Sequence, residues 1–213
     1  MYTIDHVVMA VSDLDEAGER LRRDHGLVSV PGGVHPRWGT GNRIVPLGES
    51  YLELIAVVEP DVGSASPLVR ALRERTSDGR DRWFAVCLGD PHLDATASRL
   101  GLTVEPGART RADGVELRWR GAGIDDEARE PWLPFFITWD VRPELHPGRT
   151  PAGHAIDVSG IGSVDVAGDG FRLREWLGPG GAALPIRVVE GGAPGIRAVE
   201  LARSGGGQPL RIE

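Results

Sequence analysis

The chain has 213 residues, of which 40% are hydrophobic, so it can bury the core of one large domain or of several small modules. Its formal net charge of −7 argues against a nucleic-acid partner and against an anionic membrane surface. Apart from histidine, every basic residue is arginine, so a lysine Schiff base is excluded. The single Cys87 excludes both an internal disulfide and a zinc site made of several cysteines.

The N-terminal residues lack the basic start and the long apolar run of a signal peptide. No apolar run reaches the roughly 18 residues that a membrane span needs. We therefore expect a cytoplasmic protein with a small-molecule ligand and with neither nucleic acid nor membrane as partner. The 30 glycines and 16 prolines predict many turns and short elements, which suits a strand-rich fold.

Alternation of side chains predicts a first strand over residues 2–11, with one face made of Tyr2, Ile4, His6 and Val8. Asp13 is a helix N-cap, and apolar residues at helical spacing continue from it until Gly26 ends the helix. The spacing then predicts strands over 44–47 and 51–55 and a helix over 67–75.

The same order of elements starts again at residue 82. We expect a strand over 82–88, a helix from an Asp90 cap to Gly101, a short strand or turn at 102–104, and strands near 109–111, 115–120 and 133–140. A third and shorter set of elements follows, with a helix predicted over 170–177. Its strand-like segments are 156–167, 186–189, 196–201 and 210–212. This repeat predicts an α+β fold with modules at 1–60 and 80–141 and a shorter C-terminal unit at 156–213.

A glycine-rich stretch, GGVHPRWGTGN, lies between the first helix and the strands that follow. Its glycines permit a tight loop. Polar and aromatic groups on such a loop, beside a strand edge, suit ligand capture. We therefore predict substrate contacts from Trp38, Thr40, Asn42 and Arg43, with His35 as the catalytic side chain. The alternative is a loop that closes only on itself.

Glu53 sits in the middle of the apolar strand 51–55, on the face of Tyr51 and Ile55. A carboxylate there points to solvent, pairs with Arg43, or is held in a pocket by a partner. The residue pattern alone leaves these alternatives open.

Several of these segments together resemble the glyoxalase-like branch of the vicinal oxygen chelate superfamily. They are His6-Val7-Val8 with Asp13-Leu14, then GGVHPRWGTGN, then YLELI at 51–55, and PFFITW at 134–139 followed by His146-Pro147. The resemblance is clearest over residues 1–150. It implies paired βαβββ modules whose sheets curl around a pocket, and it allows a homodimer.

The resemblance also implies chemistry. Relatives use His, Glu or Gln on the first and last strands of each module to hold a divalent metal that binds two neighbouring substrate oxygens. His6 and Glu53 match the first module's ligand positions, and such a ligand set suits Zn, Mn, Fe, Ni or Co. Trp139 and His146 then belong to the pocket rim, as substrate contacts.

The second module departs from this pattern, because neither 83–87 nor 135–139 contains His, Glu or Gln. Glu200, or one of the histidines at 35, 146 and 154, would have to complete a metal site. Two functions follow. One is a metal-dependent lyase, isomerase or dioxygenase with His6 and Glu53 as ligands. The other is a metal-free small-molecule or drug-sequestering protein whose pocket is lined by Trp38, Trp119, Trp132 and Trp139.

Overall fold

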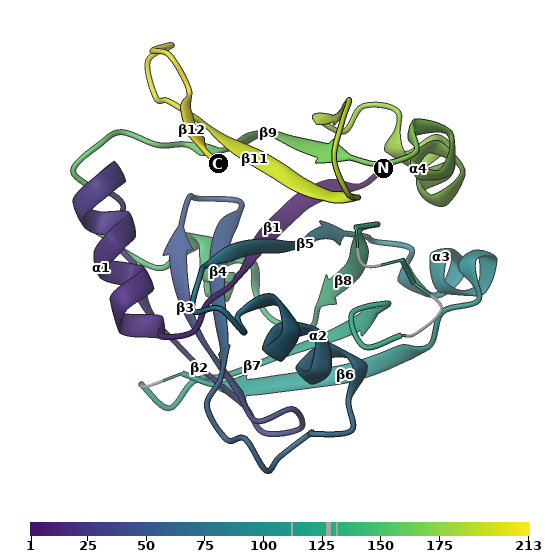
Figure 1. Ribbon diagram of the computed structural model, residues 1–213, viewed down its shortest axis with the longest axis horizontal. Coiled ribbons are helices and arrows are strands. Elements are labelled where there is room, and N and C mark those ends of the chain that lie inside the picture. The colour runs from purple at the N-terminus through teal and green to yellow at the C-terminus, as the bar shows by residue number, and fades with distance from the viewer. Residues whose placement is uncertain (112, 127–128, 131) are drawn as a thin grey trace.

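The computed structural model describes residues 1–111, 113–126, 129–130 and 132–213, and its largest part is a closed β-barrel (Figure 1). The barrel order is β1-β4-β3-β2-β6-β7-β8-β5. Its first four strands are β1 (Thr3–Ala10), β2 (Val30–His35), β3 (Thr40–Pro46) and β4 (Tyr51–Val57). The others are β5 (Arg82–Gly89), β6 (Val104–Thr110), β7 (Glu116–Ala122) and β8 (Phe135–Trp139).

Each half of the barrel follows the order strand, helix and three strands, with α1 (Leu14–His25) in the first half and α3 (Leu93–Leu100) in the second. The first and last strands of each half are parallel neighbours, β1 with β4 and β5 with β8. The halves join through antiparallel pairs, β1 with β5 and β2 with β6. The predicted α+β fold with paired βαβββ modules is confirmed.

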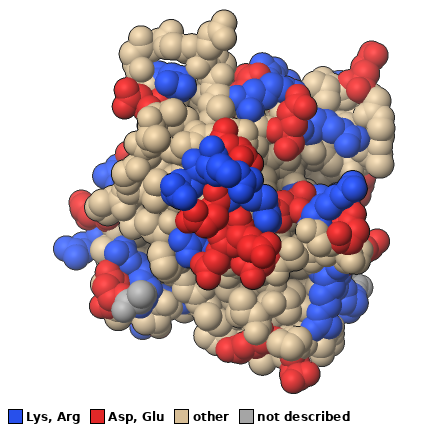
Figure 2. All heavy atoms as spheres, turned by 60° about the vertical axis from the view of Figure 1, so that its left-hand side comes forward, with Lys and Arg blue, Asp and Glu red and all other residues tan. Residues whose placement is uncertain are grey.

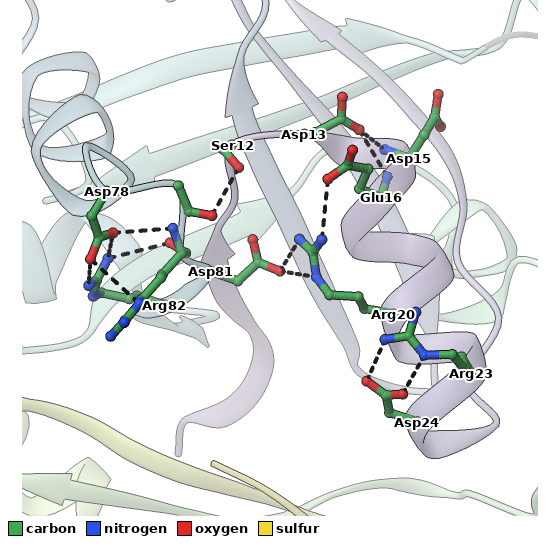
Figure 3. Close-up of polar contacts among 12 residues, drawn as sticks. Ser12, Asp13, Asp15, Glu16, Arg20, Arg23, Asp24, Asp78, Asp81 and Arg82 are labelled. Atoms are coloured by element: carbon green, nitrogen blue, oxygen red, sulfur yellow. Dashed lines mark hydrogen bonds and ion pairs between the residues drawn. The ribbon is translucent and has the colours of Figure 1, made fainter.

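Helix α1 begins where the sequence predicts, because the Asp13 carboxylate accepts from the backbone N–H groups of Asp15 and Glu16 at 2.9 Å (Figure 3). Gly26 ends the helix in the left-handed conformation, at φ 69°. Arg20 binds Asp81 at 2.6 Å and so ties the helix to the segment before β5. Helix α2 (Pro67–Arg75) connects the two halves.

Three expectations for the bounds and caps of the elements need correction. The glycine-rich stretch is mostly a hairpin of β2 and β3, with a turn over residues 36–39, because Gly39 adopts a positive φ and its neighbours pair across the strands. Strand β6 is continuous over residues 104–110, although Pro106 and Gly107 are poor strand formers. Asp90 is not the cap of α3, which begins after His92; the Asp90 carboxylate instead accepts from His92 N at 2.8 Å.

The first strand differs from simple alternation because it contains a β-bulge. The pairing of β1 with β5 shifts between Ile4 and His6, so Asp5 is an extra residue without a partner in the register. Ile4 therefore packs against the outer core, while His6 and Val8 face the barrel interior. The predicted shared face of Tyr2, Ile4, His6 and Val8 is wrong for the first two residues.

A second sheet, in the order β10-β9-β11-β12, lies against the barrel and is drawn above it in Figure 1. Its strands are β9 (Gly160–Ala167), β10 (Ile186–Val189), β11 (Gly195–Ala202) and β12 (Leu210–Ile212), and α4 (Gly170–Leu177) follows β9. Val164, Val199 and Leu201 share one apolar core with barrel residues such as Leu88. This core packs on the outside of the barrel wall and leaves the barrel interior separate.

The outer surface near α1 mixes charges of both signs, as Figure 2 shows. The neighbouring pairs include Arg20 with Glu16 and Arg22 with Glu19, both within single helical turns. Interleaved charges of this kind form a solvated face and give no single-sign field to attract a polyanion. Among the described residues, no helix combines the length and the apolar character needed to cross a membrane.

Candidate functional site

The barrel interior holds a cavity of about 60 Å³ that is lined by both polar and apolar side chains. The polar side chains come from both halves of the barrel and are His6, His35, Asn42, Tyr51, Glu53 and Arg109. The apolar wall includes Val8, Trp38, Ile55, Phe84, Trp119, Phe135, Ile137 and Trp139. A small concave pocket with a few convergent polar groups is typical of a small-molecule site.

His6 is buried and is fixed on several sides. Its Nδ1 lies 2.6 Å from Asp5 Oδ1, a contact that the bulge in β1 makes by bringing both side chains to the inner side. The imidazole stacks on the Tyr51 ring at 4.4 Å and meets the edge of Phe135 at 5.6 Å. These contacts hold the ring so that Nε2 faces the cavity and Glu53.

Asp5 is the centre of a buried hydrogen-bond network that the sequence did not reveal. Its Oδ2 accepts from Trp139 Nε1 at 2.8 Å and lies 3.1 Å from His146 Nε2. Burial alone raises the pKa of the Asp5 carboxyl, but hydrogen bonds from His146 and His6 outweigh it and hold the pKa well below its usual range. The Asp5 carboxylate is thus ionised, and it contacts His6 through Nδ1, the ring nitrogen that does not face Glu53.

Glu53 is the second carboxylate of the site and it lines the cavity rather than the solvent. Its Oε1 accepts from Asn42 Nδ2 at 2.5 Å, and its Oε2 lies 3.5 Å from His6 Nε2. Asn42 occupies space that a glycine provides, since a Cβ added at Gly32 would lie 2.1 Å from Asn42 Oδ1. Gly32 on β2 therefore leaves room for the Asn42 side chain, which donates to Glu53.

His35 ends strand β2 and is also buried. Its Nδ1 lies 3.0 Å from Thr40 Oγ1, and its ring meets Trp38 and Trp119 edge-on at 6.1 and 5.9 Å. Burial lowers the pKa of His35 from 6.5 to about 4, against the attraction of Glu53. The imidazole is therefore neutral at pH 7 and available as a proton acceptor, a hydrogen-bond donor or a metal ligand.

Arg109 brings a buried positive charge from the second half of the barrel. Its guanidinium lines the cavity and donates through Nη1 to the carbonyl of Gly32. Burial lowers the pKa of Arg109, but an arginine stays protonated at any physiological pH. A buried guanidinium beside a small cavity suits a carboxylate or an oxyanion. Arg109 lies in the predicted strand near 109–111, but no sequence pattern marks its side chain as part of a pocket.

The mouth of the cavity, where it meets an outer cavity, is held by Asp125. Its Oδ2 accepts from Trp38 Nε1 at 2.9 Å, and its Oδ1 accepts from Ser66 Oγ at 2.6 Å and from Leu68 N at 2.9 Å. An outer cavity of about 210 Å³ shares the walls Trp38, Trp119 and Ile124 with the inner one. Asp125 and Asp126 are half-buried.

Some predicted site residues lie elsewhere. Arg43 projects from the outer face of β3, where it binds Ser29 Oγ at 2.9 Å and Asp15 Oδ1 at 2.8 Å, so the structure does not bring it to the cavity. Thr40 supports His35 without lining the cavity. Trp139 lines the wall, while His146 lies behind Asp5 and lines an outer groove of about 410 Å³.

The other expected pocket residues are structural. His154 lies 3.0 Å from Val28 N and 2.8 Å from the Pro46 carbonyl, so it fastens the connecting segment to the barrel. Trp132 belongs to the outer core. Glu200 lies in the second sheet, where Arg187 and Arg211 bind it at 2.9 and 3.2 Å. None of these three lines the cavity among the described residues.

The ligand positions of the second half are apolar, since β5 and β8 present Phe84, Phe135 and Ile137 to the cavity. Asp5, His6 and Cys87 offer ligand atoms within 4.8 Å of one another. However, Asp5 is already satisfied by three hydrogen-bonding side chains, and burial raises the pKa of the Cys87 thiol well above its usual value. A protonated thiol is a poor metal ligand, so the His6–Glu53 pair is the better candidate.

The closed barrel of two repeated halves is consistent with the fold of the vicinal oxygen chelate class. The Glyoxalase-like domain family matches residues 4–178, and the chain belongs to this family. No curated protein matches the chain.

Among solved structures, a hypothetical protein from Staphylococcus aureus is similar over 100% of this chain and 86% of its own, with 17% identity and a TM-score of 0.66. Methylmalonyl-CoA epimerase from Mycobacterium tuberculosis is similar over 67% of this chain and 90% of its own, with 19% identity and a TM-score of 0.46. At these identities the likeness concerns the fold.

Proposed function

We propose that this barrel is an enzyme in which His6 and Glu53 hold a divalent metal and which acts on a small organic compound bound in the inner cavity. The reaction class is that of a lyase, isomerase or dioxygenase. The observation that carries the proposal is the 3.5 Å separation between His6 Nε2 and Glu53 Oε2.

The two atoms are both hydrogen-bond acceptors when the neutral His6 ring carries its proton on Nδ1, next to Asp5. Two buried acceptors at this separation need a proton, a cation or a water between them. Metal–ligand distances of about 2.0–2.2 Å allow one ion to contact both atoms. The Asp5–His6 contact also matches the common arrangement in which a carboxylate orients a metal-binding histidine.

The remaining polar groups have separate tasks. Arg109 neutralises a carboxylate or developing oxyanion of the substrate, and neutral His35 accepts or donates a proton. Asn42 fixes Glu53, and the aromatic wall binds the apolar body of the substrate and excludes water. When bound, the metal supplies Lewis-acid polarisation of two neighbouring substrate oxygens. The small cavity favours a compact organic acid or carbonyl compound.

A second candidate function is a metal-free binding protein that uses the same cavity. The apolar residues Phe84, Phe135 and Ile137 favour it, because they stand where further ligands would be needed. In that case a proton shared between His6 and Glu53 satisfies the pair.

A homodimer is a further expectation from the family, and light scattering of the purified protein measures it.

Calorimetric titration of metal-depleted protein with Zn²⁺, Mn²⁺, Fe²⁺, Ni²⁺ and Co²⁺ tests the proposal. Wild type should bind at least one of these ions, and His6→Ala and Glu53→Gln should each lose that binding. Arg43→Ala is the matched control, because Arg43 is the next residue after Asn42 on β3 but faces outward. Binding of none of the ions, with retained binding of small organic acids, would favour the metal-free protein.

A further inference from the structure

The geometry points to His146 as a positioning residue that selects the tautomer of His6 through Asp5, an inference that rests on the proposed role of His6. His146 belongs to the segment that connects the barrel to the second sheet, so this segment is part of the site. One chain of hydrogen bonds leads from a backbone amide of this segment to the cavity.

The chain begins at Gly148, whose backbone N–H donates to His146 Nδ1 at 3.2 Å. A ring nitrogen that accepts a hydrogen bond carries no proton, so the neutral His146 ring has its proton on Nε2. That nitrogen lies 3.1 Å from Asp5 Oδ2 and donates to it. The backbone of the connecting segment thus decides which nitrogen of His146 is the donor.

Asp5 passes this preference to His6. Its Oδ2 receives two donors, His146 and Trp139, and this fixes the plane of the carboxylate. The other oxygen, Oδ1, then lies 2.6 Å from His6 Nδ1 and can only accept. His6 must therefore hold its proton on Nδ1, which leaves the Nε2 lone pair directed at Glu53 and the cavity.

His146 is held firmly enough to act in this way. Two short 3-10 turns, η1 (Pro143–Leu145) and η2 (Pro147–Arg149), flank it. Gly148 is buried against the barrel, where an added Cβ would lie 2.4 Å from the Ser50 carbonyl oxygen, and its own carbonyl accepts from Gly48 N at 2.8 Å. The His146 ring meets Tyr51 and Trp139 edge-on at 5.7 and 5.5 Å.

The test uses the tautomer itself, measured in metal-free protein by long-range ¹H–¹⁵N correlation of the His6 ring at pH 7.5. Wild type should show the Nδ1-protonated form. His146→Phe keeps the aromatic contacts but removes both hydrogen bonds, so His6 should become a mixture of tautomers. His146→Gln retains an N–H donor and should restore the wild-type spectrum. His154→Ala is the control, since His154 fastens the same segment without touching Asp5.

If His146→Phe does not fold, His146→Asn takes its place, because its shorter amide cannot reach Asp5. An unchanged His6 tautomer in these variants, or a doubly protonated His6 ring in wild type, would overturn the inference. Metal affinity gives a second readout, with an expected loss of about tenfold in His146→Phe. If wild type binds no metal but His146→Phe still changes the His6 tautomer, the positioning role is supported and the proposed function is rejected. The two failures are therefore distinguishable.

Discussion

His6 and Glu53 meet diagonally across two parallel neighbouring strands. In the register of β1 and β4, His6 stands opposite Tyr51 and Val8 stands opposite Glu53. The diagonal neighbour on the same face is therefore within reach of a long side chain, and His6 Nε2 lies 3.5 Å from Glu53 Oε2. The same register stacks the His6 ring on Tyr51. Parallel pairing of the first and last strand of one module thus creates the pair.

The first prediction concerns the glycine that makes room for Asn42. Gly32→Ala places a Cβ 2.1 Å from Asn42 Oδ1, so the amide must move and its hydrogen bond to Glu53 must weaken. We expect a loss of about 1–3 kcal/mol in the free energy of unfolding, measured by urea denaturation. Gly153→Ala is the control, since an added Cβ there has no neighbour within 4 Å. Equal stability of the two variants would contradict the packing argument.

The second prediction concerns acid and His35. The folded pKa of about 4 lies below the ordinary value of 6.5, so the unfolded chain binds the proton more tightly. His35 therefore lowers stability progressively as the pH falls from about 6.5 to 4, by up to about 3 kcal/mol, and has no such effect above that window.

His35→Asn removes the titrating group, so its free energy of unfolding should fall less than that of wild type between pH 7.5 and pH 4.5. Urea denaturation at both pH values measures the difference. Other groups, such as Asp5, titrate in both proteins and cancel in the comparison. The same decrease in wild type and variant would show that His35 is not buried as a neutral base.

The third prediction concerns the mouth of the cavity. Asp125→Ala removes the acceptor shared by Trp38, Ser66 and Leu68, and we expect a loss of about 1–3 kcal/mol in stability. Trp38 should also become more exposed and shift its fluorescence to longer wavelength. Asp94→Ala, which breaks an exposed ion pair with Arg120, should cost no more than about 1 kcal/mol and leave the emission unchanged. A small effect of Asp125→Ala would mean that the mouth does not depend on this carboxylate.

Much of the fold could be predicted from the sequence because its elements repeat. Periodicity places Glu53 on the face of Tyr51 and Ile55, and all three line the cavity. The resemblance to the family implies that His6 faces the same cavity, and His6 does line it. The Asp13 cap and Gly26 act within a few residues of the helix ends. The bounds of α1 can therefore be predicted without knowledge of the tertiary structure.

The missing parts of the site depend on pairing between distant strands. The bulge that turns Asp5 inward is a mismatch between β1 and β5, and a single strand does not reveal it. Arg109 lies on a strand whose Pro106 and Gly107 conceal its length, and Gly107 is there because Trp119 covers it. His35 looks like a loop residue because the glycines around it allow a loop, but its strand pairs with β3 in a hairpin, and Gly32 leaves room there for Asn42.

The metal content of the protein tests the central claim most directly. Protein purified without a histidine tag, exposed to the five divalent ions and then dialysed, should retain one metal ion per chain by elemental analysis. His6→Ala should lose that metal while its circular dichroism matches wild type, and Arg43→Ala should retain it. Metal-free wild-type protein, or equal metal content in wild type and His6→Ala, would contradict the claim that His6 and Glu53 form a metal site.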